Sequence, residues 1–250
     1  MATTRHTSKP PKVKAPHEKR SSPPSRQSIV IALGIAIVAA TALVAFALIA
    51  RKDSSPAPVT TQATNLEGVP QSVRVLGSPS ARVEILEFSD AQCPGCRYYA
   101  LDVLPTIVRE FVRPGKVKIG YHAYPFIGTD SVRGARFLLA ASLQNKAWQL
   151  HDALYRSQGA ENSGWLTDDL VRRVGSEIPG LDVDRLFRDA NSQEITAMGN
   201  ADLRQAKAFN VRGTPTLFVK VGNAAPYELS STTPLNLDQM RAALDDALRS

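Results

Sequence analysis

The 250-residue sequence has only two cysteines, Cys93 and Cys96, with two residues between them. A disulfide-stapled scaffold needs more cysteines at wider spacing, so that class of protein is excluded. The chain also lacks GxSxG, Walker-loop and HExxH motifs, which leaves hydrolase and nucleotide-binding functions without support. None of its four histidines has the paired spacing of metal ligands: His6, His17, His122 and His151. We therefore expect neither a metal nor a cofactor.

The net charge of +7 is confined to one end of the chain. Seven Lys or Arg and one acidic residue precede residue 29, giving that segment +6, and the remainder is nearly neutral at +1. Residues 1–28 are also rich in Ser, Thr and Pro, a composition that buries too little apolar surface to fold. We predict a basic disordered tail, and we expect no nucleic-acid partner because the basic excess belongs to this tail.

Residues 29–50 contain neither a charged residue nor a proline. Their length matches the ~20 apolar residues that a helix needs to cross a bilayer. A cleaved signal peptide is the alternative, since Ala45 and Ala47 offer a small-x-small pattern, but its apolar core is usually ~7–15 residues. More basic residues precede the segment than follow it, which favours a cytoplasmic N-terminus. The sequence thus predicts a single-pass anchor in the cell membrane, with everything after residue 50 outside the cytoplasm.

The rest of the chain predicts an α/β fold. Residues 51–68 are a polar, flexible linker, and residues 69–250 carry the periodic apolar patterns of a folded domain. The predicted elements are a strand at 82–89, a helix at 98–112 with a kink at Pro105, a strand at 116–124, helices between 131 and 209, strands at 216–221 and 225–229, and a helix at 237–248. This order places a helical insertion, about 128–208, inside an α/β sheet.

The motif Cys93-Pro94-Gly95-Cys96 lies between a predicted strand and a predicted helix. A helix N-terminus offers unpaired N–H groups and about half a positive charge. Such a position can lower a cysteine pKa from ~8.5 into the range ~3.5–7.5. Pro94 suits the first helical position, and the spacing brings Cys96 onto the same face, within disulfide range. We expect Cys93 to attack and the more buried Cys96 to resolve the mixed disulfide.

Other interpretations of the pair are weaker. A zinc site would need two further ligands, and a c-type haem site would need His after Cys96, where the chain has Arg97. An inert local disulfide stays open as an alternative. We interpret His151, Trp148 and His122 as packing residues. Asp90 either caps the turn before the motif or influences it through its charge.

At this point the sequence resembles a known family. The segment GSPSARVEILEFSDAQCPGC (Gly77 to Cys96), followed far downstream by VRGTPTLFV (Val211 to Val219), is similar to the DsbA-like thiol:disulfide oxidoreductases of the thioredoxin superfamily. Within this family it resembles the membrane-anchored branch of Gram-positive-type cell envelopes. The resemblance covers roughly residues 68–249 and implies a thioredoxin-like fold that includes the helical insertion.

The resemblance also assigns roles to three further residues. Pro215 matches the cis-proline that faces the CxxC motif and whose neighbouring backbone pairs with substrate. Thr214 matches the residue that tunes thiolate stability and substrate release. Glu87 matches the buried acid that handles protons near the resolving cysteine, whereas the residues alone leave an ordinary surface position as the alternative. The sequence departs from the family at Pro94-Gly95, because its strongest oxidases have Pro-His and a histidine stabilises the thiolate.

The resulting functional prediction is an extracytoplasmic dithiol oxidase that introduces disulfides into reduced exported proteins. The resemblance implies reoxidation by a quinone-linked membrane partner of the DsbB-like or VKOR-like type. A reductase or isomerase that uses the same residues is one alternative. A non-catalytic thioredoxin-fold binding or chaperone module is another.

Overall fold

The computed structural model describes residues 66–230 and 237–250. The predicted tail, membrane anchor and most of the linker lie outside these residues. The chain divides into two units, Met1–Ala57 and Pro58–Ser250, and all described residues belong to the second. Within the described ranges, no helix has the length and apolar character needed to cross a membrane.

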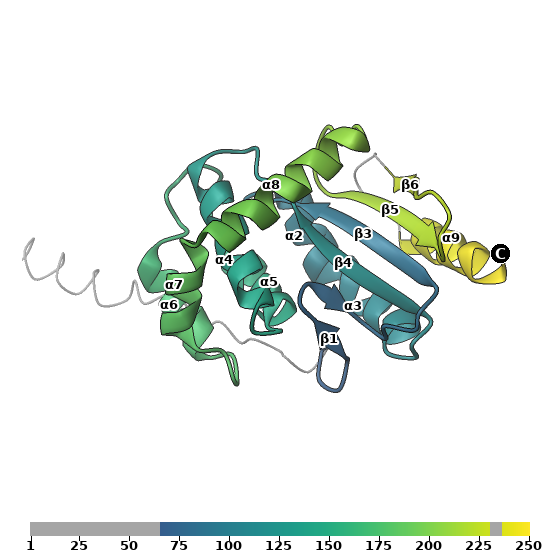
Figure 1. Ribbon diagram of the computed structural model, residues 1–250, viewed down its shortest axis with the longest axis horizontal. Coiled ribbons are helices and arrows are strands. Elements are labelled where there is room, and N and C mark those ends of the chain that lie inside the picture. Colours follow the sequence, from purple (N-terminus) through teal and green to yellow (C-terminus); the bar gives the residue numbers. More distant parts are fainter. Residues whose placement is uncertain (1–65, 231–236) are drawn as a thin grey trace, which may run out of the picture. The chain divides into compact units, whose positions relative to one another are not determined.

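A six-stranded mixed sheet forms the centre of the described unit, with the strand order β1-β2-β4-β3-β5-β6 (Figure 1). Strand β3 pairs in parallel with β4 and antiparallel with β5. The strands are β1 (Gln71–Ser72), β2 (Val75–Leu76), β3 (Val83–Ser89), β4 (Val117–Ala123), β5 (Thr216–Val221) and β6 (Tyr227–Ser230). The central position of β3 explains why six of its seven residues are buried, as expected of a strand covered on both faces.

Successive residues of β3 point to opposite faces of the sheet. On one face, Val83 and Ile85 belong to the large hydrophobic core. On the other face, Leu86 and Phe88 belong to a smaller hydrophobic cluster, which includes residues around the end of α8 (Gln193–Ala208). By the same alternation Glu87 and Ser89 lie on the face of the large core. Their polar side chains therefore enter an apolar environment.

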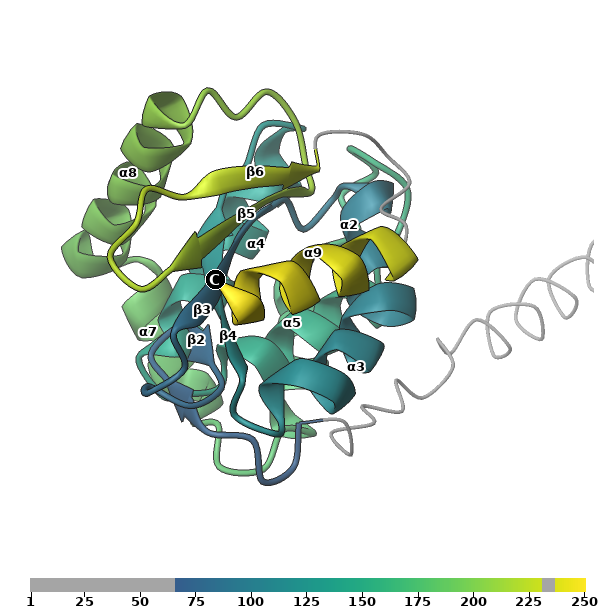
Figure 2. The same ribbon diagram turned by 90° about the vertical axis from the view of Figure 1, so that its right-hand side faces the viewer.

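Helices cover both faces of the sheet. Figure 2 shows α3 and α9 on one face and α8 on the other. The helical elements are α2 (Pro94–Tyr98), η2 (Tyr99–Val103), α3 (Leu104–Ile107), η3 (Val108–Val112), α4 (Thr129–Ser142), α5 (Ala147–Arg156), α6 (Asp168–Ser176), α7 (Val183–Ala190), α8 and α9 (Leu237–Arg249). The helices α4 to α8 lie between β4 and β5 in the chain, so the predicted helical insertion is present.

The helix that follows the CxxC motif is irregular. Elements α2, η2, α3 and η3 follow one another without a break, and η2 and η3 are π-helical turns. Pro105 lies in the first turn of α3, directly after η2, and the N–H of Leu104 bonds back to the carbonyl of Tyr99. Because proline has no N–H and crowds the preceding turn, a wider turn beside it is expected. The kink at Pro105 stays a prediction, and the structure shows a π-helical turn directly before this proline.

Several local sequence signals decide where helices begin. The side chains of Thr167, Asp182 and Ser192 each accept a hydrogen bond from a backbone N–H three residues ahead, at the starts of α6, α7 and α8, as helix N-caps do. The short β1–β2 hairpin was missed, because two-residue strands carry no readable period.

Gly134 and Gly199 form a matched pair for testing the packing of the insertion. A Cβ at Gly134 would lie 2.5 Å from Cβ of Ala91, whereas one at Gly199 would meet only Leu139 Cδ1 at 3.8 Å. We predict that Gly134→Ala destabilises the fold by about 1 kcal/mol net, because overpacking at ~1–3 kcal/mol exceeds the helix gain. Gly199→Ala should stabilise it by about 0.5–1 kcal/mol. Urea denaturation of the full chain measures both changes, and effects of the same sign would contradict this packing.

Candidate active site

Cys93 and Cys96 begin the helical segment that follows β3. Cys93 occupies the N-cap position with extended backbone (φ −71°, ψ 121°), and Pro94 starts α2, as predicted. Both cysteines are free thiols in the structure. Cys93 is 7% exposed and Cys96 is fully buried. The more accessible sulfur is therefore the one at the helix N-terminus.

The surroundings of Cys93 favour its thiolate. Its pKa is lowered from an ordinary 9.0 to about 6, chiefly by a hydrogen bond from the Cys96 thiol. Burial opposes this change, and contacts with Thr214 and with the backbone N–H groups of Cys96 and Gly95 add to it. At neutral pH the Cys93 sulfur is therefore largely ionised and nucleophilic.

The surroundings of Cys96 have the opposite effect. Burial raises its pKa well above the ordinary value, and the neighbouring Cys93 raises it further. The backbone N–H of Asp90, 3.5 Å from Cys96 Sγ, and the Ser89 hydroxyl oppose this only in part. The two sulfurs thus share one proton, which stays on Cys96.

The loop before β5 faces Cys93. The Thr214–Pro215 peptide bond is cis, and Cys93 Sγ lies 3.1 Å from the carbonyl oxygen of Thr214. A groove of about 400 Å³ beside this loop is lined by Arg212, Thr214, Pro215 and Glu228 among others. The structure therefore brings two segments, separated by more than 100 residues, to the same sulfur.

Asp90 joins the two loops that flank the cysteines. It is buried, and its Oδ1 accepts from the N–H of Gln92 at 2.9 Å. Its Oδ2 accepts from the N–H groups of Phe126 and Ile127 at 2.8 and 3.2 Å. Of the two roles considered from the sequence, the turn-capping role is the one that these contacts support.

Glu87 is fully buried, which excludes the surface position left open by the sequence. Its Oε1 lies 3.2 Å from Nε2 of His151 on α5. Its Oε2 is buried without a hydrogen-bond partner among the described residues. His151, interpreted from the sequence as a packing residue, is packed among aromatic rings, but it is also the polar partner of the acid.

Sequence reasoning missed Ser89 and Tyr155. The Tyr155 hydroxyl lies 2.8 Å from Ser89 Oγ and donates to the carbonyl of Asp90 at 3.0 Å. Its ring packs in one cluster with Cys93 and Cys96. The available signal was periodicity, since His151 and Tyr155 share one face of α5. No local pattern shows, however, that this face meets β3.

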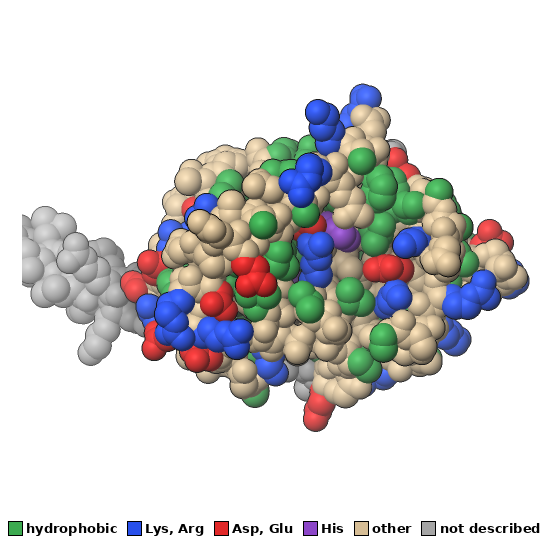
Figure 3. Space-filling model, in the orientation of Figure 1, with side chains coloured by type: hydrophobic (Ala, Val, Ile, Leu, Met, Phe, Trp, Pro, Cys, Tyr) green, Lys and Arg blue, Asp and Glu red, His purple; other side chains and the backbone are tan. Residues whose placement is uncertain are grey.

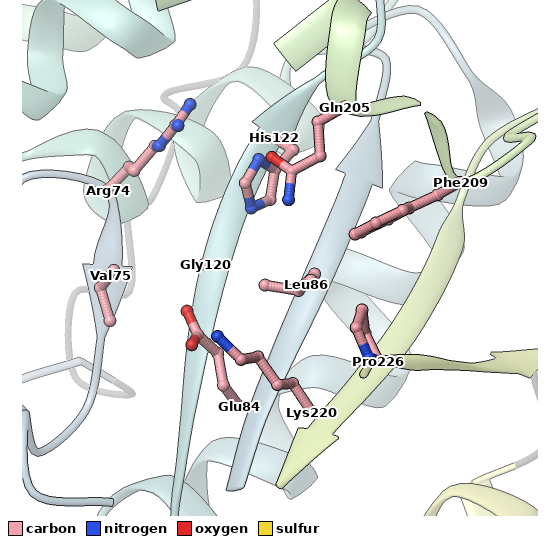
Figure 4. Close-up of a pocket in the computed structure, with 10 residues that line it drawn as sticks. All are labelled: Arg74, Val75, Glu84, Leu86, Gly120, His122, Gln205, Phe209, Lys220 and Pro226. Atoms are coloured by element: carbon pink, nitrogen blue, oxygen red, sulfur yellow. The ribbon is translucent and has the colours of Figure 1, made fainter. Parts of the chain in front are cut away.

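A separate groove of about 330 Å³ lies on the opposite face of the sheet (Figure 4). Its lining includes Glu84, Leu86 and His122, and the space-filling view of this side shows charged and hydrophobic side chains interspersed around a histidine (Figure 3). His122 Nδ1 lies 3.0 Å from Oδ1 of the buried Asp202. Among the described residues, no group of three or more His, Cys, Asp or Glu is placed to hold a metal ion.

These features define a class of protein. A sheet of thioredoxin type carries an ionisable cysteine at a helix N-terminus, a buried second cysteine one turn later, and a cis-proline loop facing the first. An accessible, low-pKa thiolate with a resolving partner performs thiol–disulfide exchange. The site is that of a thiol–disulfide oxidoreductase.

Comparison with known proteins gives the family. A family model described as thioredoxin matches residues 70–246. "Probable disulfide bond formation protein D" of Bacillus cereus is 32% identical over 177 residues, which cover 70% of this chain and 78% of that protein. The chain belongs to the thioredoxin superfamily as a DsbA-like protein thiol:disulfide oxidoreductase.

Solved structures support the same fold. The oxidised BdbD of Bacillus subtilis superimposes with a TM-score of 0.63 at 21% identity, covering 73% of this chain and 98% of that one. A thioredoxin-like oxidoreductase from Silicibacter pomeroyi gives a TM-score of 0.56 at 28% identity, covering 78% and 99%. Both alignments extend well beyond the CxxC motif, so the likeness includes the helical insertion.

Two substitutions of Cys96 test the origin of the Cys93 thiolate. We predict that Cys96→Ala raises the Cys93 pKa clearly above about 6, because it removes the largest stabilising hydrogen bond. Cys96→Ser keeps an O–H donor and should raise the pKa less. The pH dependence of alkylation by iodoacetamide reports this pKa directly. Equal values in both variants would show that the Cys96 donor has no such role.

The lowered Cys93 pKa also makes the stability of the reduced protein depend on pH. The unfolded thiol binds its proton up to about pH 9, whereas the folded one releases it near pH 6. The stabilisation that comes from the lowered pKa is complete above the pKa of the unfolded thiol, and it is lost as the pH falls toward 6. The disulfide form does not titrate at these sulfurs. We therefore predict that the free energy of unfolding of the reduced form, relative to that of the oxidised form, rises from pH ~6 to ~8.5. Denaturation midpoints of both forms measure this. Cys93→Ala, which has neither the Cys93 thiolate nor the disulfide, should follow the pH dependence of the oxidised form.

Proposed function

We propose that the chain is a dithiol oxidase that works outside the cytoplasm and introduces disulfides into exported proteins through Cys93 and Cys96. One observation carries the proposal: the pKa of Cys93 is lowered to about 6. An oxidised enzyme whose reduced form is stabilised gives up its disulfide readily. Stabilisation of the Cys93 thiolate therefore favours transfer of the disulfide from enzyme to substrate.

The reaction follows from the unequal burial of the two sulfurs. A substrate thiolate attacks Cys93 of the enzyme disulfide, because Cys96 is fully buried. The Cys93–Cys96 bond breaks, and its electron pair and a proton end on Cys96. A second substrate thiolate then attacks the mixed disulfide, and Cys93 leaves as a thiolate that is stable near neutral pH.

Reduced, unfolded proteins are the substrate class that the surface favours. The aromatic side chains of Tyr98 and Phe126, 43% and 53% exposed, lie on the helix and the loop that flank the cysteines. The groove beside Thr214 and Pro215 offers backbone groups next to the reactive sulfur. Exposed apolar side chains and extended backbone are what an unfolded chain presents. In this proposal Pro215 and Thr214 position substrate, and Glu87 handles the proton of Cys96.

The proposal includes a membrane and a partner. The apolar segment at residues 29–50 anchors the chain with its N-terminus in the cytoplasm. After each turnover the dithiol passes two electrons to the disulfide of a quinone-linked membrane protein of the DsbB-like or VKOR-like type. Relatives named as disulfide bond formation proteins support this direction of electron flow.

The reduction potential of the full chain tests the direction of the reaction. We predict a value nearer to about −120 mV than to about −270 mV, the potentials of a strong oxidant and of thioredoxin. The reason is that Cys96, Thr214 and backbone N–H groups stabilise the thiolate although Gly95 replaces a histidine. Equilibration with glutathione buffers measures it. A value near about −270 mV would indicate a reductase.

Cys93→Ser provides the control for chemistry itself. If it retains function in cells that lack the wild-type chain, the protein acts as a binding or chaperone module and the oxidase proposal is wrong. Catalysed reshuffling of a scrambled substrate without net oxidation would instead indicate an isomerase.

A further inference from the structure

Two polar side chains of α5 contact two polar side chains of β3, and the pairs follow the same order along the helix and the strand. Glu87 and Ser89 are two residues apart on one face of β3, and His151 and Tyr155 are four residues apart on one face of α5. Oε1 of Glu87 lies 3.2 Å from Nε2 of His151, and Ser89 Oγ lies 2.8 Å from the Tyr155 hydroxyl. The helix is therefore held against the strand by two polar contacts at adjacent levels, inside an otherwise apolar core.

Tyr155 connects this arrangement to the cysteines. Its ring packs with Cys93 and Cys96, and its hydroxyl donates to the carbonyl of Asp90, whose own N–H points at Cys96 Sγ. The backbone of α5 is also held to the site, because Arg97 Nε donates to the carbonyl of Tyr155 at 3.1 Å. A helix of the insertion thus supports the same region that contains the resolving sulfur.

The two carboxylate oxygens of Glu87 have different surroundings. Oε1 is engaged by His151, whereas Oε2 is buried without a partner among the described residues. A buried oxygen without a donor is an unusual and unfavourable arrangement for a carboxylate. It leaves Oε2 as the atom of Glu87 that is available to bind a proton.

His151 is the basic side chain that pairs with Glu87 in the described part of the chain. The other titratable groups whose electrostatics involve both Glu87 and Cys96 are Tyr99, Tyr121 and Tyr155. Burial raises the pKa of all three phenols, so they stay neutral. A change of charge on Glu87 can therefore be compensated by the imidazole of His151.

We infer that His151 is a positioning residue for proton transfer at Cys96: it holds Oε1 of Glu87 and compensates its charge, which leaves Oε2 to exchange the proton. This inference rests on the proposed role of Glu87 and extends it to a residue of the helical insertion. When Cys96 resolves a mixed disulfide, its proton moves to Glu87, its sulfur bonds to Cys93, and the bound thiolate departs. In the reverse step Glu87 returns the proton to the leaving Cys96 sulfur.

One assay separates the two sulfurs. The reduced full chain is mixed with an aromatic disulfide, dithiobis-nitrobenzoate, and the coloured thiolate is followed by stopped flow. The first release reports attack by Cys93, and the second reports resolution by Cys96. Only the second step requires removal of the Cys96 proton, so it alone should depend on His151.

The main variant is His151→Gln, whose amide can donate to Oε1 but cannot carry a charge. We predict an unchanged first release and a second release slowed by about 10-fold or more, toward the lower end of general-base effects. The pH–rate profile of the second release should change in this variant while that of the first release does not, because only the second step exchanges a proton with Glu87. A purely structural role would not change one profile alone.

The structure supplies a matched control on the other face of the sheet. His122 is also buried and hydrogen-bonded to a buried carboxylate, that of Asp202, but it lines the groove on the other face of the sheet (Figure 4). His122→Asn, which keeps a donor near the Nδ1 position, should leave both releases unchanged. If it slows the second release as His151→Gln does, the effect reflects general loss of core polarity and the inference is wrong.

Glu87→Gln distinguishes the inference from the proposal on which it rests. It should slow the second release at least as much as His151→Gln, and the double variant should be no slower than Glu87→Gln alone. If Glu87→Gln slows that step and His151→Gln does not, Glu87 acts without His151 and the inference falls. If neither slows it, the proposed role of Glu87 fails as well. Equal slowing of both releases in His151→Gln would show a structural effect and overturn the inference.

Discussion

The unequal solvation of two sulfur atoms is the constraint on which this site depends. Cys96 is fully buried, so its thiol keeps the proton and can donate a hydrogen bond to the slightly exposed Cys93. That donor is the largest contribution to the lowered pKa of Cys93. Both effects have one origin, because burial that disfavours charge on one sulfur makes it a hydrogen-bond donor to the other.

The remaining architecture maintains this difference. Strand β3 lies at the centre of the sheet and ends at the motif, and Asp90 ties the flanking loops together through three backbone N–H groups. The cis-proline loop closes the exposed side, with the Thr214 carbonyl 3.1 Å from Cys93 Sγ. The Pro94-Gly95 dipeptide contributes no charged side chain. The thiolate is stabilised by hydrogen bonds instead.

The helical insertion has a role beyond enlarging the domain. Helices α4 and α5 help to enclose the region behind the cysteines, and Gly134 lets α4 approach Ala91 closely. Helix α5 supplies the partners of Glu87 and Ser89, two polar groups that β3 places in the core. Without His151, Oε1 of the buried Glu87 would lose its polar partner, so the strand and the helix depend on each other at this point.

The sequence by itself predicted the order of the elements from β3 onward and the position of the CxxC motif between a strand and a helix. The apolar period and the proline of the CxxC motif are local, so they can be read without a fold; the strand predicted at 82–89, for example, is found as β3 at Val83–Ser89. Family resemblance added Pro215, Thr214 and Glu87. Only the tertiary structure decided that Glu87 is buried, that His151 is its partner, and that Ser89 and Tyr155 lie beside Cys96. These facts depend on which face of α5 meets β3, a contact between segments more than 60 residues apart that no local pattern encodes.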